Sequence, residues 1–278
     1  MLIDTHAHLN FPDYKKDLDQ VINRSMENGV TKIICVSSNL ADSEEAIRLA
    51  KKHPGVIYAA VGIHPQQTDP GNNQSLKEQI DRLAKLATQK EVVAVGECGL
   101  DFSPAPPGEK DRTQEEQTFL FQEQIKIARK LNLALIIHSR KAFAETIRHI
   151  EPFAHNPPPT THNFLRGVFH CYSAGKKGIK KINQLGFYFG VDGNLTYDLG
   201  LQNTFRQIPL DEIILETDCP FLSPVPFRSQ RNEPKNIKTI ADFLSGLTDK
   251  PTQEVASQTS QNAINLFGIK ENQKTLIN

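Results

Sequence analysis

Short apolar runs alternate along the chain with longer segments in which apolar residues recur every three or four positions. A short apolar run bounded by turn residues predicts a buried β-strand, whereas the longer periodicity predicts an amphipathic α-helix. The segment 13–28 is of the second kind and stops at Gly29. Its apolar face contains Leu18, Val21 and Ile22. The eight predicted strands are 2–8, 32–36, 56–61, 92–95, 133–137, 168–169, 187–191 and 213–215.

Helical segments separate the predicted strands in regular order. The predicted helices are 13–28, 41–52, 76–88, 113–131, a segment ending near 150, 179–185, one opened by Pro234, and 252–267. This alternation over 278 residues is typical of a (β/α)8 barrel, which commonly needs about 250 residues. No shift in composition marks a domain boundary, so we expect residues 1–278 to form a single TIM-type barrel domain. A doubly wound open sheet is the structural alternative.

Composition and charge restrict the class of protein. Hydrophobic residues make up 38% of the chain and charged residues 23%, as in soluble globular proteins. Lys plus Arg and Asp plus Glu number 32 each, so no overall field attracts nucleic acid or an anionic membrane. Any contact with nucleic acid must therefore be local. We expect no membrane association, because no apolar run approaches the roughly 18 residues of a membrane span.

The cysteines are scattered, and none belongs to a CxxC pair. They are Cys35, Cys98, Cys171 and Cys219. Each lies in or beside an apolar run, which is typical of reduced, buried thiols rather than of a disulfide framework. We therefore expect a cytoplasmic protein. No sequence feature indicates a protein partner, and we expect a monomer.

Residue types that ligate metals follow the predicted strands. His6 and His8 end the first apolar run, and in an extended segment both side chains point to one face and can hold a cation between them. In a barrel, the carboxyl ends of the strands converge at one mouth. Seven candidates occupy such ends: His6, His8, His64, Glu97, His138, His170 and Asp218. A single histidine there is a weak signal, but the repetition predicts a metal-dependent active site at this mouth.

The composition of this set favours two cations. Four imidazoles and two carboxylates exceed the needs of one tetrahedral ion but suit two ions that share a carboxylate. Two such metals about 3.5–4 Å apart polarise a phosphoryl or acyl oxygen and activate water near neutral pH. The site therefore predicts hydrolysis with divalent ions, and magnesium, manganese or zinc are all compatible with imidazole and carboxylate ligands.

Six short motifs follow one another along nearly the whole chain. They are Asp4-Thr5-His6-Ala7-His8, Gly62-Ile63-His64-Pro65, Gly96-Glu97-Cys98-Gly99-Leu100-Asp101, Ile137-His138-Ser139-Arg140, His170-Cys171-Tyr172-Ser173 and Glu216-Thr217-Asp218-Cys219-Pro220. With these motifs the chain resembles the TatD-type metal-dependent deoxyribonucleases, within the wider amidohydrolase group of barrels. The ordered set is highly specific, although any one motif alone is weak.

The resemblance implies two metal positions joined by one carboxylate. The first is held by His6, His8 and Asp218 and the second by His138 and His170, with Glu97 as the bridge. Asp218 is also implied to orient or deprotonate the attacking water, a role that its place near the metal permits. Asp218 and Glu97 are therefore the expected catalytic residues.

The resemblance also implies a substrate. The activity of the family is hydrolysis of DNA phosphodiester bonds, commonly as a 3′ to 5′ exonuclease, and the near-zero net charge favours short or single-stranded DNA. His64 is implied to lie near the substrate rather than to bind metal. Arg228 and Arg231 flank the expected mouth, where a guanidinium can bind phosphate through two hydrogen bonds. The alternative for this segment is that Asn232 and Glu233 only start the next helix.

The sequence leaves open the role of Glu216, the effect of two unusual loops and the choice between competing functions. Glu216 either fixes a metal ligand or is an ordinary buried carboxylate. The loops 102–112 and 152–164 depart from the family pattern, which puts the choice of substrate in question more than the metal chemistry. The competing functions are an amidohydrolase or lactonase acting on a small carbonyl substrate and a non-catalytic nucleic-acid-binding barrel. The position of Glu97 as the bridge favours the phosphodiesterase, and the complete ligand set argues against the non-catalytic protein.

Overall fold

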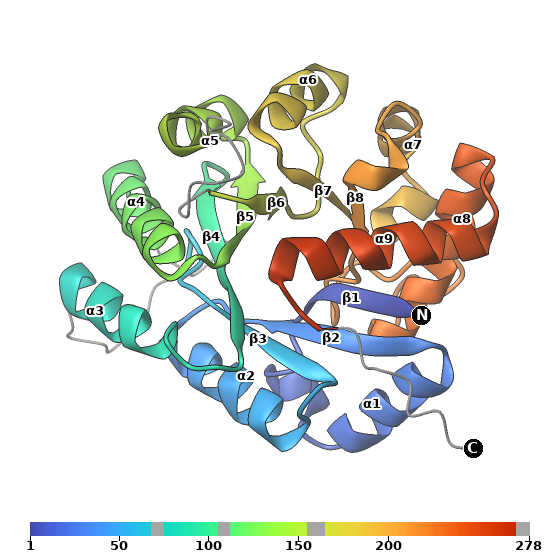
Figure 1. Cartoon of the computed structure of the whole chain (residues 1–278), viewed down its shortest axis with the longest axis horizontal. Coiled ribbons are helices and arrows are strands. Elements are labelled where there is room, and N and C mark those ends of the chain that lie inside the picture. The colour runs from blue at the N-terminus through green and yellow to red at the C-terminus, as the bar shows by residue number, and fades with distance from the viewer. Residues whose placement is uncertain (68–74, 105–111, 155–164, 271–278) are drawn as a thin grey trace.

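Eight parallel strands form a nearly closed barrel in the computed structural model, which describes residues 1–67, 75–104, 112–154 and 165–270. The strands pair in chain order, so each lies beside the next one along the sequence (Figure 1). Their bounds are Leu2–Ala7 (β1), Val30–Val36 (β2), Ile57–Val61 (β3), Val92–Asp101 (β4), Ala134–Arg140 (β5), Gly167–Phe169 (β6), Tyr188–Val191 (β7) and Ile213–Leu215 (β8). The predicted barrel is confirmed, and the open-sheet alternative is wrong.

A ring of helices surrounds the strands (Figure 1). The α-helices are Leu18–Glu27 (α1), Leu40–Lys52 (α2), Leu76–Leu86 (α3), Gln114–Leu131 (α4), Phe143–Ile150 (α5), Lys176–Leu185 (α6), Leu199–Phe205 (α7), Ile237–Thr248 (α8) and Thr252–Phe267 (α9). Short 3-10 helices are Pro12–Tyr14 (η1), Glu151–Phe153 (η2), Gly193–Thr196 (η3), Leu210–Glu212 (η4) and Pro234–Asn236 (η5). The sequence did not predict α7, and Pro234 opens η5, directly before α8. Within the described residues, no helix combines the length and apolar character needed to cross a bilayer.

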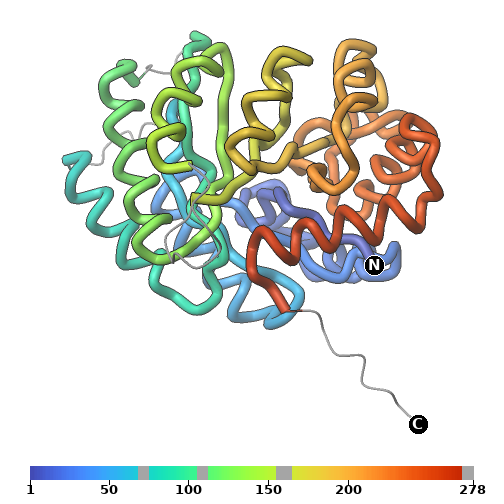
Figure 2. The backbone as a smooth tube through the Cα atoms, turned by 45° about the horizontal axis from the view of Figure 1, so that its top comes forward, coloured from blue at the N-terminus to red at the C-terminus, as the bar shows by residue number. Residues whose placement is uncertain are grey.

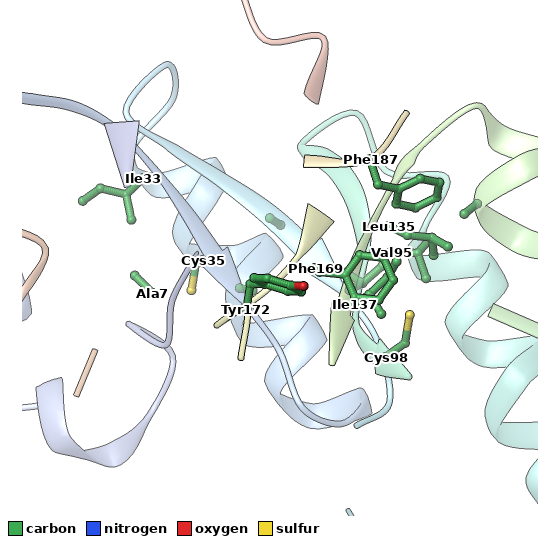
Figure 3. Packing of buried hydrophobic residues seen from close by; sticks show 14 of the residues in the cluster. Ala7, Ile33, Cys35, Val95, Cys98, Leu135, Ile137, Phe169, Tyr172 and Phe187 are labelled. Carbon is green, nitrogen blue, oxygen red and sulfur yellow. The ribbon is translucent and has the colours of Figure 1, made fainter. Parts of the chain in front are cut away.

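The core has two layers, one between strands and helices and one inside the barrel. In the outer layer, Leu135 and Ile137 of β5 lie among Val95, Cys98 and Phe169 of the neighbouring strands (Figure 3). The intervening residues of β5 point inward, as strand alternation requires. Helix α9 packs against β1 and β8 and crosses one end of the barrel (Figures 1 and 2). The inner layer therefore continues into this helix and contains Ile3, Ile34, Ala60, Ala94, Ile136, Val168, Ile214, Ala263, Leu266 and Phe267.

Two strands contain an irregularity where they approach the opposite end of the barrel. The pairing of β1 with β2 shifts between Asp4 and Ala7, and that of β4 with β5 shifts between Val95 and Cys98. Val95 and Cys98 both belong to the outer layer, although strict alternation would place them on opposite faces. The extra residue of the bulge turns Glu97 toward the barrel interior.

The seam between β1 and β8 closes largely through one buried carboxylate. Asp4 accepts hydrogen bonds from the Thr217 amide (3.0 Å), the Thr217 hydroxyl (2.6 Å) and the His6 amide (3.2 Å). Backbone bonds from the Asp218 amide to the His6 carbonyl and from the His8 amide to the Cys219 carbonyl, both 2.8 Å, extend the contact. The seam therefore fixes the two ends of the described sheet against each other.

Replacing Asp4 with alanine should destabilise the protein strongly. The change leaves buried donors of Thr217 and His6 without an acceptor, at a cost of about 2–4 kcal/mol in the free energy of unfolding. Urea denaturation in the presence of a chelator measures this cost without a contribution from bound metal. The matched control is Asp13→Ala, an exposed carboxylate with an expected change within about 0.5 kcal/mol. Equal effects of the two substitutions would show that Asp4 does not support the seam.

Candidate metal centre

Two histidines and one aspartate meet where the seam reaches the barrel mouth. The Nε2 atoms of His6 and His8 lie 3.2 Å apart, and Asp218 Oδ1 lies 3.6 Å from the first and 3.3 Å from the second. Ligand atoms about 2.1 Å from a tetrahedral or octahedral cation are separated by roughly 3.0–3.4 Å. The three atoms therefore already have nearly the spacing that a shared cation imposes.

The carboxylate of Glu97 lies at the centre of the larger cluster. Its side chain is 6% exposed, and it reaches five imidazoles from four other strand ends. The distances from the Glu97 carboxylate oxygens are 2.7 Å to His138 Nδ1, 3.6 Å to His6 Nε2 and to His170 Nε2, 3.7 Å to His64 Nε2 and 3.9 Å to His8 Nε2. Since Asp218 contacts His6 and His8, all seven candidates identified at strand ends belong to one cluster, with Glu97 at its centre.

Three overlapping donor groups in this cluster have ligand atoms within 4.8 Å of one another. The groups are His6 with His8 and Asp218, His6 with Glu97 and His170, and His64 with Glu97 and His138. The Nδ1 atom of His6 is buried and has no hydrogen-bond partner among the described residues. Imidazole and carboxylate donors at these spacings fit divalent metal ions. The grouping differs from the expectation in two respects. His64 lies about as close to Glu97 as the expected ligands do. His138 and His170, which were expected to share one ion, fall in different groups, His170 with His6 and His138 with His64.

Further carboxylates orient two of the histidines. His138 is held between Glu97 and Asp101, whose Oδ2 lies 3.1 Å from Nε2 of the ring. Glu216 Oε1 lies 3.1 Å from His170 Nδ1 and accepts the Cys171 amide at 2.5 Å. Of the two alternatives for Glu216, the geometry therefore supports the one in which it fixes a candidate ligand.

Asp101 was not singled out from the sequence as a site residue. The prediction ended the fourth strand at residue 95, whereas β4 continues to Asp101. Beyond the bulge, Glu97, Gly99 and Asp101 lie on the same face of the strand, because every second residue does. The spacing of four residues between Glu97 and Asp101 could therefore have indicated that both acidic side chains point into the site.

The charges of the cluster balance internally. Burial alone would raise the pKa of Glu97, but the imidazoles of His170 and His64 hold it well below its usual range. Burial alone would lower the pKa of His138, yet hydrogen bonds with Asp101 and Glu97 raise it to about 9. The protonated His138 imidazole therefore offsets part of the buried negative charge, and a divalent cation can take over this role with release of a proton.

The loop that bears Asp218 is clamped by Asn232. The buried side-chain amide of Asn232 donates to the Thr217 carbonyl (2.9 Å) and to the Phe221 carbonyl (2.7 Å). Asp218 itself has a φ of 53°, an uncommon conformation for a residue with a side chain. The role of Asn232 is thus structural, but it fixes the loop of a candidate ligand as well as preceding η5.

The two arginines near the mouth differ in their surroundings. The guanidinium of Arg231 donates to both carboxylate oxygens of Asp17, at 2.9 and 2.6 Å, and to Glu233 at 3.1 Å. The exposed Arg228 stacks on the ring of Tyr197, with 3.9 Å between the guanidinium carbon and the ring centroid. Arg231 is therefore committed to ion pairs, whereas Arg228 makes no hydrogen bond or ion pair within the described residues and so keeps its donors available for a ligand.

His64 and the beginning of the loop 102–112 lie beside His138 and Asp101. His64 lies beside His138, with 4.4 Å between the ring centroids, and burial together with that neighbour lowers the pKa of His64 to about 4. In the segment after Asp101, the Ser103 amide donates to the Asp101 carboxylate at 2.8 Å. Residues 105–111 and 155–164, which include most of the two loops, lie outside the described residues.

Comparison with known proteins agrees with this geometry. The family model described as "TatD related DNase" matches residues 3–268. An uncharacterized metal-dependent hydrolase of Bacillus subtilis, YabD, is 32% identical, with 97% of this chain and 100% of the relative covered. The human deoxyribonuclease TATDN3 is 30% identical, with 96% of this chain and 94% of the relative covered.

Solved structures show the same architecture. The crystal structure of YJJV, a TatD homologue from Escherichia coli, superimposes with a TM-score of 0.81 and 28% identity, covering 97% of this chain and 98% of the other. A TatD family hydrolase from Entamoeba histolytica, at 24% identity, has a TM-score of 0.82 and supports the fold. On the family match, the relatives and the strand-end cluster together, the chain belongs to the TatD family of metal-dependent hydrolases.

Proposed function

We propose that the protein is a deoxyribonuclease that hydrolyses DNA phosphodiester bonds with two divalent metal ions. The observation that carries the proposal is the central position of Glu97, whose carboxylate joins separate groups of imidazole donors. A carboxylate between two such groups suits a pair of cations and has no comparable use for one. The name of the human relative TATDN3 supports DNA as the substrate.

The proposed ligands divide between two positions. His6, His8 and Asp218 hold one ion, His138 and His170 hold the other, and Glu97 lies between them. Bound magnesium, manganese or zinc supplies Lewis-acid polarisation of a phosphoryl oxygen and lowers the pKa of water. Asp101 and Glu216 keep the rings of His138 and His170 in orientation.

Asp218 is the proposed acceptor of the proton from the attacking water. Its side chain is 14% exposed, compared with 6% for Glu97, so it is the more accessible of the two central carboxylates. Burial opposes its ionisation, but the hydrogen bond with His8 and the nearby His170 lower the pKa of Asp218. The carboxylate is therefore available as a base while the water oxygen attacks phosphorus and the bond to the sugar oxygen breaks.

His64 and Arg228 are the proposed substrate contacts. His64 borders the cluster and is held neutral by its low pKa, so it can donate one hydrogen bond to a phosphodiester oxygen without adding charge. Arg228 presents a planar guanidinium that fits a phosphate. We propose a short or single-stranded DNA substrate, cleaved from its 3′ end by a monomeric cytoplasmic enzyme. All four cysteines are unpaired, which supports a reducing compartment.

A hydrolase of small carbonyl substrates is the competing function. Such barrels often use a carboxylated lysine as the bridge, whereas the ion pairs of Glu97 in the described part of the chain are all with histidines. A glutamate bridge therefore favours the phosphodiesterase. Small esters and lactones belong in the assay as alternative substrates.

Cleavage of DNA should require both bound metal and Asp218. Chelator-stripped protein should not cleave single-stranded DNA, and magnesium, manganese or zinc should restore cleavage. Asp218→Asn should reduce the restored rate at least about a hundredfold, because the variant loses both a ligand and a base. Separate 3′ and 5′ labels show from which end the strand shortens.

Asp198→Asn is the matched control, since Asp198 is an exposed carboxylate that caps α7. Its activity should equal that of the wild type. Turnover of esters or lactones without any cleavage of DNA would replace the deoxyribonuclease proposal with the carbonyl hydrolase. Cleavage of DNA that persists in Asp218→Asn would remove Asp218 from the mechanism.

Arg228 should contribute to binding of the oligonucleotide rather than to the chemical step. Arg228→Ala should raise KM for an oligonucleotide several-fold with little change in kcat, because one phosphate contact is lost. The slope of log affinity against log salt should fall by about 0.7, the value for one phosphate of a single strand. Arg206→Ala, at an exposed arginine directly after α7, should change neither quantity. An unchanged salt slope in Arg228→Ala would exclude the phosphate contact.

A further inference from the structure

An exposed phenylalanine stands directly beside the metal centre. Phe221 is 52% exposed, and its ring centroid lies 6.2 Å from that of the candidate ligand His8. Phe11 stacks on His8 at 4.6 Å and meets Phe221 edge to face at 6.2 Å. A continuous aromatic surface thus extends from the metal centre to solvent.

The backbone on which Phe221 is mounted is fixed relative to the site. Its amide donates to the Asp218 carbonyl at 2.9 Å, and its carbonyl accepts the Asn232 side chain at 2.7 Å. A ring that is exposed yet anchored three residues from a candidate catalytic carboxylate is prepared to bind a flat ligand group without a large loss of conformational entropy.

A groove of about 610 Å³ begins beside Phe11 and continues between the first turn of α1 and the face of α2 that runs from Ala41 to Lys52. Three of its four acidic residues form ion pairs, since Asp17 pairs with Arg231, Asp19 with Lys52 and Glu45 with Arg48. The fourth, Asp42, accepts a hydrogen bond from the Asn39 side chain at 2.9 Å. The exposed Lys15 and Lys16 also line the groove, and in the described part of the chain neither ammonium group forms a hydrogen bond or ion pair. Arg48 and, more weakly, Lys15 lower the pKa of Glu45. The groove therefore offers two ammonium groups that are not held in ion pairs, next to the aromatic surface.

We propose that Phe221, backed by Phe11, is a platform on which a base of single-stranded nucleic acid stacks, and that Lys15 and Lys16 bind the adjoining phosphates. The inference rests on the proposed function, because it places the substrate strand on one side of the same centre. Aromatic side chains interleaved with basic ones bind single strands in this way, since every base has a π-face and every nucleotide a negative charge. The platform explains how a chain of zero net charge binds a polyanion locally.

Binding of a fluorescein-labelled oligonucleotide, followed by anisotropy, tests the platform. The Asp218→Asn background prevents cleavage during the measurement. Phe221→Ala should weaken binding on the order of tenfold, as expected for the loss of one base stack. Phe221→Trp should retain the wild-type affinity. Phe119→Ala is the matched control, because Phe119 is 38% exposed but lies on the outer helix α4, and it should leave binding unchanged.

An oligonucleotide of abasic sugars separates stacking from a general disturbance of the fold. It carries the same phosphates without bases, so the parent protein should bind it more weakly than the normal oligonucleotide. Phe221→Ala should cause no further loss of affinity for the abasic oligonucleotide. The pair Lys15→Ala and Lys16→Ala should lower the salt slope by roughly 1.4, from two phosphates at about 0.7 each. The control pair Lys90→Ala and Lys130→Ala, at the other end of the barrel, should leave that slope unchanged.

The outcomes distinguish this inference from the proposed function. If the wild type cleaves DNA while Phe221→Ala binds the normal oligonucleotide as tightly as its parent, the platform is wrong and the deoxyribonuclease stands. An equal loss of affinity for the abasic oligonucleotide in Phe221→Ala also overturns the platform. A wild type that binds as proposed but cleaves no DNA overturns the proposed function alone, and a protein that binds no oligonucleotide overturns the platform.

Discussion

The buried carboxylate of Glu97 imposes the main constraint on this structure. An ionised carboxylate that is 6% exposed is tolerable only where positive charge and hydrogen-bond donors surround it. The barrel supplies both by aiming histidines from several strand ends at one point, and His138 and His170 are themselves balanced by Asp101 and Glu216. The result is a preassembled set of donors whose charge fits divalent cations. The stability of the mouth and its chemistry therefore depend on the same contacts.

The seam between β1 and β8 shows how the fold makes this arrangement accurate. His6 and His8 come from the first strand and Asp218 follows the last, so their mutual spacing depends on how well the barrel closes. Asp4 and the paired backbone bonds at the seam hold the two segments together directly beneath these side chains. At the opposite end, α9 covers the apolar interior of the barrel. Packing thus closes one end, and polar contacts define the other.

Most of the fold followed from periodicity, because long amphipathic helices and buried strands leave a strong pattern. All eight strands and the convergence of seven candidate residues were predicted in this way. The bulge at Glu97 could not be read from alternation, since an inserted residue reverses the faces that alternation assigns. The bulge is also the reason why the predicted strand ends at residue 95 and does not include Asp101 as a site residue. Helix α7 was missed because it is short and Leu199 is exposed, so its apolar pattern is weak.

The net charge of zero describes the whole molecule and not the distribution of charge at the barrel mouth. The sum of zero hides an uneven arrangement, in which most charges around the mouth are paired internally, as Arg231 is with Asp17. The cations that remain without ion pairs among the described residues near the mouth include Lys15, Lys16 and Arg228. Because screening limits each charge to a range of about 8–10 Å, a strand at the mouth responds to these cations rather than to the distant balance. Local pairing, and not the total, therefore decides whether a polyanion can approach the metal centre.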